Sequence, residues 1–315
     1  MSPETRFARD DKQIRIIANK TLTTTNHIPR PRVACEISAE RVVAARLADG
    51  ATNLEAATAA LPPGLLTPGL QQANVTDRAK LVPALRELLT AVAGRSRDVC
   101  LVLPDSTTRV MLLDFETLPD KKQDADAVVR FRLKKSLPFD VDQASLSYER
   151  QGTTDQIRVV AAVTPHSVLE EYESLVREAG YNPGTVLPSM LAALGLVDGS
   201  RPAMVIKVEH GTTTFAIVDQ DQLLLYRSLD NGGSTVTGES LVDDVNTSLV
   251  YFEDRYGVNV ERLLVTGVQS AQALQEALGG GEIRVEELVL SSGAAGTAGN
   301  PNRALLAGVA GALAS

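Results

Sequence analysis

Residues 33–47 read VACEISAERVVAARL, and residues 205–218 read VIKVEHGTTTFAIV. Each stretch runs from an apolar strand through an acidic residue and a turn of small or polar residues into a second apolar strand, which is the pattern of a β-hairpin. The two acidic positions, Glu36 and Glu209, lie more than half the chain apart. This spacing predicts two similar domains that each open with a hairpin, although one such hairpin taken alone is a common motif.

The composition is that of a folded protein with room for two cores. The chain has 315 residues, of which 44% are hydrophobic, and this length exceeds one ordinary core. The two cysteines, Cys35 and Cys100, lie in apolar strand-like runs; they indicate reduced, buried thiols in an intracellular protein rather than a disulfide framework. The net charge of −8 excludes a general nucleic-acid binder, because neutralising phosphates requires a basic surface.

No stretch predicts a signal peptide or a membrane span. Residues 1–31 are polar and mixed in charge, which predicts a flexible N-terminal tail. The apolar run at 304–314 is well below the roughly 20 residues that cross a bilayer. Contact with a membrane is therefore expected to come through a partner.

The rest of the first half alternates helices with strands, which is typical of α/β architecture. The expected helices are 77–94, 124–136, 165–179 and 189–196, and the expected strands are 99–103, 109–113 and 157–163. We expect the first two of these strands in one sheet. Residues 51–75 contain Pro62-Pro63-Gly64 and Pro68-Gly69 and predict a loop.

The second half begins after a boundary of turn-forming residues at 198–202. Its expected elements are a meander (203–208, 214–218 and 223–227), a glycine turn at 231–235, a long helix that ends at Gly257, a strand at 263–265 and a terminal helix at 303–313. The glycines of the turn permit positive φ and let backbone amides approach a ligand. The small residues of the terminal helix predict very close packing against a neighbour.

Several of these segments together resemble the type IV pilus assembly protein PilM family, within the actin-like ATPase superfamily. They are Leu118-Pro119, Leu137-Pro138-Phe139, 157–180 (IRVVAAVTPHSVLEEYESLVREAG), 210–214 (HGTTT), Gly232-Gly233 and 263–267 (LLVTG). Their order and spacing match over residues 33–314, although no single piece is decisive. The resemblance implies a two-domain actin-like α/β fold: a first domain at 32–199 with an inserted subdomain at about 118–150, and a second domain at 200–315.

The resemblance also implies a cytoplasmic scaffold, peripheral to the inner membrane. Proteins of the family bind the short cytoplasmic N-terminal tail of the membrane protein PilN beside the inserted subdomain, together with other pilus-assembly components. An extended peptide of this kind can add to a strand edge or lie in an apolar groove. We expect the PilN-like tail to bind around four residues: Arg130, Arg132, Leu137 and Phe139. The basic run that contains the arginines also fits a solvated helix face, and a homo-oligomer remains open.

In this superfamily the two hairpin turns face each other across an interdomain cleft and hold the phosphates of a nucleotide. By resemblance, nine residues would line that cleft: Glu36, Ser38, Glu209, Gly211, Thr212, Thr213, Gly232, Gly233 and Gly267. Several depart from the family pattern. The first turn has Glu36-Ile37-Ser38 in place of Asp-Ile-Gly, Val42-Val43 stand where the family has a lysine, and Glu209 replaces an aspartate. A longer carboxylate reaches toward the phosphate instead of holding hydrated magnesium at a distance.

The nucleotide cleft is also expected to lack its lid. Only residues 234–241 separate Gly233 from the apolar face of the long helix, so the helical lid subdomain is reduced or absent, and a pocket without one wall loses affinity. Val268 in place of a second family glycine would crowd the adenosine side.

These changes favour a binding scaffold with a degenerate cleft over an enzyme. The alternative is a nucleotide-dependent switch or weak ATPase that uses ATP or ADP with magnesium. No other catalytic or metal site is expected, because His27, His166 and His210 are dispersed and no serine lies in a nucleophile elbow. His210 can contact an anion in the cleft or bond to the turn that carries it.

Overall fold

The computed structural model describes residues 31–47, 54–71, 73–153, 156–236, 238–267, 270–279, 283–290 and 303–314. The predicted N-terminal tail, apart from Pro31, and Val268 lie outside these residues. None of the described helices is long and apolar enough to cross a membrane.

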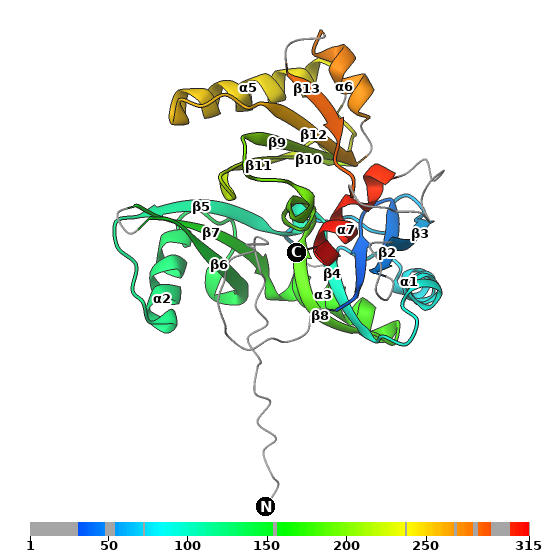
Figure 1. Cartoon of the computed structure of the whole chain (residues 1–315). Coiled ribbons are helices and arrows are strands. Elements are labelled where there is room, and N and C mark those ends of the chain that lie inside the picture. The colour runs from blue at the N-terminus through cyan, green and yellow to red at the C-terminus, as the bar shows by residue number, and fades with distance from the viewer. Residues whose placement is uncertain are drawn as a thin grey trace, which may run out of the picture.

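Two five-stranded sheets of the same topology form the framework of the molecule (Figure 1). The first sheet has the order β3-β2-β1-β4-β8 and contains β1 (Val33–Ile37), β2 (Arg41–Leu47), β3 (Leu54–Ala60), β4 (Asp98–Leu103) and β8 (Asn182–Pro188). The second has the order β11-β10-β9-β12-β13 and contains β9 (Ala203–Glu209), β10 (Thr212–Asp219), β11 (Gln222–Asp230), β12 (Arg262–Gly267) and β13 (Arg284–Glu287). In both, an antiparallel meander is extended by two parallel strands. The predicted duplication is therefore confirmed.

Each sheet buries one face under helices of its own domain. In the first domain, α1 (Arg78–Val92) and α3 (His166–Glu178) cover the face formed by Val33, Cys35 and Ile37. The helix α1 begins where expected, since the Asp77 side chain accepts a hydrogen bond from the Lys80 backbone N–H at 3.2 Å. Burial raises the pKa of the Cys35 thiol, so this thiol stays protonated and packs as an apolar group.

In the second domain, α5 (Glu239–Tyr256) and α6 (Ala271–Ala277) cover the face formed by Met204, Ile206 and Val208. The long helix begins soon after the glycine turn and ends at Gly257, whose backbone is left-handed. The short connection from Gly233 to α5 matches the prediction that the helical lid subdomain is reduced or absent there.

The first half of the chain also forms a third, smaller sheet. It has the order β5-β7-β6 and contains β5 (Arg109–Phe115), β6 (Ala144–Thr153) and β7 (Gln156–Pro165), with α2 (Lys122–Leu133) packed on one face. The expectation that 109–113 lies in one sheet with 99–103 is wrong, because the short helical turn Asp105–Thr107 redirects the chain between them. The unit around the expected insertion therefore draws its strands from residues 109–165.

Two further expectations need correction, and one strand was not predicted. The supposed loop at 51–75 contains β3, an edge strand of which only Leu54 is buried, so its sequence carries no clear alternation. The segment before the helix at 189 is β8, which tolerates Pro183 because it is also an edge strand. The helix at 124–136 ends at Leu133, before the turn that leads to Pro138.

The C-terminal segment crosses from the second domain back to the first. A short turn of helix (Arg303–Leu306) leads into α7 (Ala307–Ala314), which packs against α4 (Ser189–Ala193) and β1. A Cβ atom at Gly311 would lie 2.0 Å from the carbonyl oxygen of Ala192, so only glycine allows the helices to approach this closely. The close packing predicted for the terminal helix is thus present.

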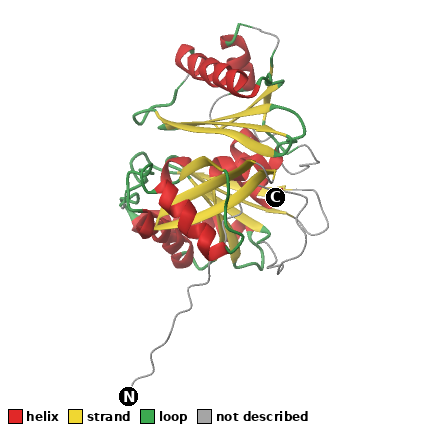
Figure 2. Cartoon of the chain, turned by 90° about the vertical axis from the view of Figure 1, so that its left-hand side faces the viewer, coloured by secondary structure: helices red, strands yellow, loops and turns green. Residues whose placement is uncertain are grey.

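The two domains share one apolar core at their junction. It combines Ala34 and Val102 of the first sheet with Val205 and Ala216 of the second, and α4 and α7 fill the space between them. Figure 2 shows the second sheet above the first domain. The helices of the second domain lie above that sheet, on the side away from the first domain. The inner faces of both sheets therefore meet at this junction, and polar side chains on those faces are forced together.

Candidate functional site

The candidate site lies where β1 and β9 end at the junction. Alternation along β1 places Glu36 on the same face as Ala34, and alternation along β9 places Lys207 and Glu209 on the same face as Val205. These are the faces that meet between the domains. Equivalent strands of the two duplicated sheets thus bring two acidic residues and one lysine to a single point.

The Lys207 ammonium lies at the centre of this cluster. Its Nζ atom is 3.0 Å from Glu36 Oε1 and 2.6 Å from Glu209 Oε1, and it donates a third hydrogen bond to the hydroxyl of Ser189. The Ser189 hydroxyl in turn donates to Glu36 Oε1. All three ammonium donors are therefore used, although the lysine side chain is only 4% exposed.

A further carboxylate, that of Asp105, lies beside the cluster. Asp105 Oδ1 accepts hydrogen bonds from the Met190 backbone N–H at 2.8 Å and from the Tyr226 hydroxyl at 3.3 Å. One oxygen of each inner carboxylate, Glu36 Oε2 and Asp105 Oδ2, is buried without a hydrogen-bond partner. Negative charge at this point therefore depends mainly on Lys207 for its compensation.

The charges perturb one another in a consistent way. Burial raises the pKa of Asp105, and the Lys207 ammonium opposes that rise. Burial raises the pKa of Glu209 in the same manner. For Lys207, burial favours the neutral amine, but the surrounding carboxylates, led by that of Glu209, outweigh it and raise the pKa of the ammonium above 10.5. The lysine is therefore a fixed cation at physiological pH.

The helix α7 closes the cluster from the side of the first domain. A Cβ atom at Gly308 would lie 2.3 Å from Glu36 Oε2 and 2.9 Å from Ser189 Oγ. Glycine is needed at this position because any side chain would displace the buried carboxylate. The sequence of α7 is thus fitted to the presence of Glu36 beneath it.

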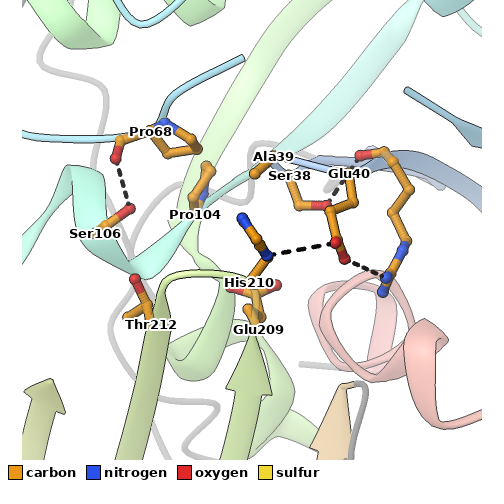
Figure 3. A pocket seen from close by; sticks show the side chains of 10 residues that line it. Ser38, Ala39, Glu40, Pro68, Pro104, Ser106, Glu209, His210 and Thr212 are labelled. Atoms are coloured by element: carbon orange, nitrogen blue, oxygen red, sulfur yellow. Dashed lines mark hydrogen bonds and ion pairs between the residues drawn. The ribbon is translucent and has the colours of Figure 1, made fainter. Parts of the chain in front are cut away.

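The two hairpin turns meet above the cluster and enclose a small cavity. Its volume is about 30 Å³, and it is lined by Ser38, Ala39, Glu40, Arg41, Pro68, Pro104, Ser106, Glu209, His210 and Thr212. Figure 3 shows Glu40 of the first turn facing His210 of the second, with 3.6 Å between Glu40 Oε1 and His210 Nδ1. Glu40 also pairs with Arg41 at 3.0 Å. This space is about a tenth of the smallest ordinary small-molecule pockets, roughly 300–1,000 Å³.

The structure brings together part of the predicted nucleotide site. Ser38, Glu209 and Thr212 line the cavity, and Glu36 lies beneath it. Gly211 lies in the turn between β9 and β10, Gly232 and Gly233 lie in the turn after β11, and all three have positive φ. A hydrogen bond of 2.9 Å from the Asn231 N–H to the Gly211 carbonyl joins the two turns. The turn geometry expected from the sequence is therefore present.

Two of the predicted cleft residues, Thr213 and Gly267, make structural contacts outside the cavity. Thr213 is buried on the face of β10 that also carries Phe215, away from the junction, and its hydroxyl accepts from the Asn231 side chain at 2.9 Å. Gly267 ends β12, where a Cβ atom would lie 2.1 Å from the carbonyl oxygen of Val208. A close contact between neighbouring strands explains this glycine without a ligand.

Glu36 and Glu209 were predicted as site residues, but the other members of the cluster were not. Lys207 stands in the quoted stretch VIKVE, where a charge two positions before an acid in an otherwise apolar strand was a usable signal. Ser189, Asp105 and Gly308 gave no such signal, because their positions next to Glu36 depend on the path of α4, the Asp105–Thr107 turn and α7.

The part of the chain that the structure describes contains no group of three or more His, Cys, Asp or Glu side chains arranged to hold a metal ion. The carboxylates at the junction face an ammonium ion instead, at hydrogen-bond distance. A cluster of this kind already has the cation that buried carboxylates require.

The residues expected to bind a partner lie around the end of α2. The Arg130 guanidinium donates to the carbonyl oxygens of Val141 at 2.5 Å and Ala144 at 3.2 Å, so it connects α2 to the start of β6. Leu137 and Phe139 are half-buried against the core of the small sheet. Arg132 is exposed and is the member of the set that a partner can reach without rearrangement.

This architecture was compared with those of known proteins. No protein-family model and no curated protein match the sequence. Among solved structures, the chain is similar to one described as the PilM-PilN type IV pilus biogenesis complex, with a TM-score of 0.72 and 18% identity over 91% of this chain and 97% of that chain. The chain has a PilM-like, actin-like fold.

Two less similar structures are the cytoplasmic domain of EpsL, an inner-membrane component of the type II secretion system of Vibrio cholerae, and the ethanolamine utilization protein EutJ from Carboxydothermus hydrogenoformans. EpsL gives a TM-score of 0.49 and 11% identity over 76% of this chain and 83% of that chain. EutJ gives a TM-score of 0.47 and 13% identity over 92% of both chains. The fold class expected from the duplicated hairpins is confirmed by the PilM-like match and the repeated sheet topology.

Proposed function

We propose that this protein is a scaffold of the type IV pilus assembly platform. It would act in the cytoplasm, at the inner membrane, by binding the N-terminal tail of a PilN-like membrane protein and other assembly components. The proposal is supported by the match to a structure described as a PilM-PilN complex, which extends over nearly all of both chains. The acidic net charge of −8 also agrees with a protein partner rather than a nucleic acid.

One observation carries the choice of a scaffold over an ATPase: the Lys207 ammonium lies between Glu36 and Glu209 at the domain junction. In an actin-like ATPase this region faces the phosphates and their magnesium ion. Here a side chain of the protein satisfies the acids, so magnesium would have to displace Lys207 from carboxylates it already neutralises.

The space above the cluster supports the same choice. The cavity between the turns is small, and the carboxylates of Glu40 and Glu209 line it. A triphosphate placed there would meet the Glu40 carboxylate at close range, and the neighbouring cations Arg41 and Lys207 already pair with Glu40 and Glu209. We therefore propose that the cleft is degenerate and that it holds the two domains together.

A peptide-binding experiment tests the scaffold directly. A synthetic peptide of the cytoplasmic N-terminal tail of the PilN-like protein from the same cell is titrated into the full chain by calorimetry. We expect binding that Arg132→Glu weakens about tenfold or more, because charge reversal at an exposed binding position costs at least ~1.4 kcal/mol. Arg132 is preferable to Leu137 and Phe139, whose replacement would also disturb the core of the small sheet.

The matched control is Arg95→Glu, which reverses an exposed arginine between α1 and β4. We expect this variant to bind the peptide as the natural protein does. If the peptide does not bind, the scaffold function is wrong; if both variants bind equally well, the partner surface lies away from Arg132.

The nucleotide-dependent switch remains the second candidate, because Gly211 of the second hairpin and both glycines of the turn at 231–235 have positive φ, and Thr212 lines the cavity. Calorimetric titration of magnesium-ATP and magnesium-ADP into the full chain separates the two candidates. We expect no heat of binding in the micromolar range. Micromolar affinity that Lys207→Met changes would show that the cleft is a working nucleotide site.

A further inference from the structure

The cluster at the domain junction contains more carboxyl groups than its one ammonium ion can neutralise. Glu36 and Asp105 are buried, and the Glu209 carboxylate lies with them, 2.6 Å from Lys207 Nζ. If all three carboxyl groups were ionised, two of their negative charges would have no cation. A charge without compensation inside a protein is so costly that the group takes up a proton and becomes neutral instead.

Asp105 is the carboxyl group that the ammonium does not bind directly. The three hydrogens of Lys207 Nζ go to Glu36, Glu209 and the Ser189 hydroxyl, so the lysine has no donor left for Asp105. The Ser189 hydroxyl also donates to Glu36. The lysine therefore pairs with the two glutamates and acts on Asp105 only from a distance.

The hydrogen bonds of Asp105 come from neutral groups and reach only one of its two oxygens. Oδ1 accepts from the Met190 backbone N–H at 2.8 Å and from the Tyr226 hydroxyl at 3.3 Å. Oδ2 has no hydrogen-bond partner, and the residue is only 1% exposed, so bulk water cannot reach it. On an ionised carboxylate, this oxygen would carry negative charge that no donor stabilises.

The packing around the cluster leaves little space for a further ion. The cavity between the hairpin turns is lined by Glu209 but by neither Glu36 nor Asp105. Beside α7 the packing is tight, since a Cβ atom at Gly308 would lie 2.3 Å from Glu36 Oε2. A proton needs no cavity, and it is therefore the cation that fits this site.

We propose that Asp105 is a neutral carboxylic acid in the folded protein at physiological pH, so that the domain junction binds one proton. The proton lies on Oδ2, and Oδ1 remains the acceptor for Met190 and Tyr226. The proton comes from the solvent when the chain folds and returns to it when the chain unfolds. Burial raises the pKa of Asp105 in agreement with this assignment, and Lys207 opposes the rise only in part.

The bound proton makes the contact between the two domains sensitive to pH. Asp105 belongs to the first domain and bonds to Tyr226 of the second. Loss of the proton adds a third negative charge to those of Glu36 and Glu209, which act on Asp105 through space, and their repulsion weakens the junction. The ionisable side chains that face Asp105 or its partner Tyr226 are Glu36 of β1, Lys207 and Glu209 of β9, Tyr226 of β11 and Arg109 of β5. The helices α4 and α7 contain no ionisable residue.

The number of protons released on unfolding tests the proposal. The full chain is unfolded in urea at pH 7, and the base needed to hold the pH constant is measured. We expect the natural protein to release about one proton more per molecule than Asp105→Asn, because an aspartate in the unfolded chain is ionised at this pH. The asparagine keeps the acceptor oxygen and supplies an N–H donor in place of the O–H. Asp243→Asn, at an exposed position on α5, is the matched control and should release as many protons as the natural protein, since water surrounds this side chain in both states.

Carbon-13 NMR locates the proton. The full chain is prepared with aspartate labelled at the side-chain carboxyl carbon, whose chemical shift differs between the protonated and the ionised form. At pH 7 we expect one signal at the protonated position, and we expect this signal to be missing from Asp105→Asn. The spectrum of the natural protein is informative even if the variant does not fold.

Thermal unfolding at two pH values tests the effect on the junction. As the pH rises from 7 to 9, the midpoint should fall more for the natural protein than for Asp105→Asn, because stability linked to a raised pKa is lost as the pH rises. Equal falls would contradict a proton-dependent junction.

Equal proton release from the natural protein and Asp105→Asn would overturn the proposal. A labelled protein whose aspartates are all ionised at pH 7 would overturn it as well, because any difference in proton release would then belong to Glu36 or Glu209. In that case another donor, such as a buried water molecule, must reach Asp105 Oδ2.

Discussion

Replacement of Lys207 by methionine is the sharpest test of the junction. Methionine keeps most of the aliphatic stem and removes the ammonium, so packing changes little while the charge is lost. The side chain is 4% exposed, and its two carboxylate partners, Glu36 and Glu209, are 6% and 16% exposed. The variant therefore leaves two carboxylates near each other in a region of low dielectric constant.

Loss of one member of a buried ion pair destabilises proteins by about 3–5 kcal/mol. We expect the lower end, about 3 kcal/mol, because Glu209 can turn toward solvent and either carboxyl group can take up a proton. At roughly 2–4 °C for each kcal/mol, the midpoint of thermal unfolding should fall by about 6–12 °C. Differential scanning calorimetry of the full chain at pH 7 measures this change.

The triple variant Glu36→Gln, Lys207→Met, Glu209→Gln is the control for this experiment. It removes the charges together, and replacement of a whole buried ion pair by neutral groups is often neutral in stability. We expect it to recover most of the loss. A decrease of less than about 1 kcal/mol for Lys207→Met alone, a size typical of an exposed pair, would refute the argument that the lysine compensates buried charge.

Two other substitutions probe the same cluster. Gly308→Ala should lower the free energy of unfolding in urea by about 1–3 kcal/mol, as overpacked sites do, because the new Cβ atom would lie 2.3 Å from Glu36 Oε2. The control is Gly69→Ala, whose Cβ atom meets no atom within 4 Å and which should be nearly neutral. Equal effects of the two substitutions would contradict the close approach of α7. Asp105→Asn should gain stability relative to the natural protein as the pH rises from about 4 to 7. Burial raises the pKa of Asp105 above 3.8, so the stability linked to its protonation is complete below that pH and is lost as the pH rises through the folded-state value. Urea unfolding at several pH values measures the difference between the two proteins, and a difference independent of pH would mean that Asp105 does not titrate in this range.

Much of the architecture was predictable because short stretches of neighbouring residues determine it. The apolar runs of β1, β2, β9 and β10, each pair separated by a short polar turn, predicted both hairpins and hence the duplication. The cap at Asp77 and the left-handed Gly257 marked where α1 begins and α5 ends. The edge strands β3, β8 and β13 were missed, because backbone pairing to a neighbouring strand holds them and their own side chains show little periodicity.

The sequence by itself determined that this chain has two domains of related topology, since an apolar run followed by a turn is a pattern of a few neighbouring residues. Only the tertiary structure decided what lies between the domains. Lys207, Glu36, Ser189 and Gly308 are far apart in the chain, and they meet because two sheets turn their inner faces together and α7 returns across the junction. An ion pair in low dielectric depends on distance and burial, and neither is a property of any single stretch of sequence.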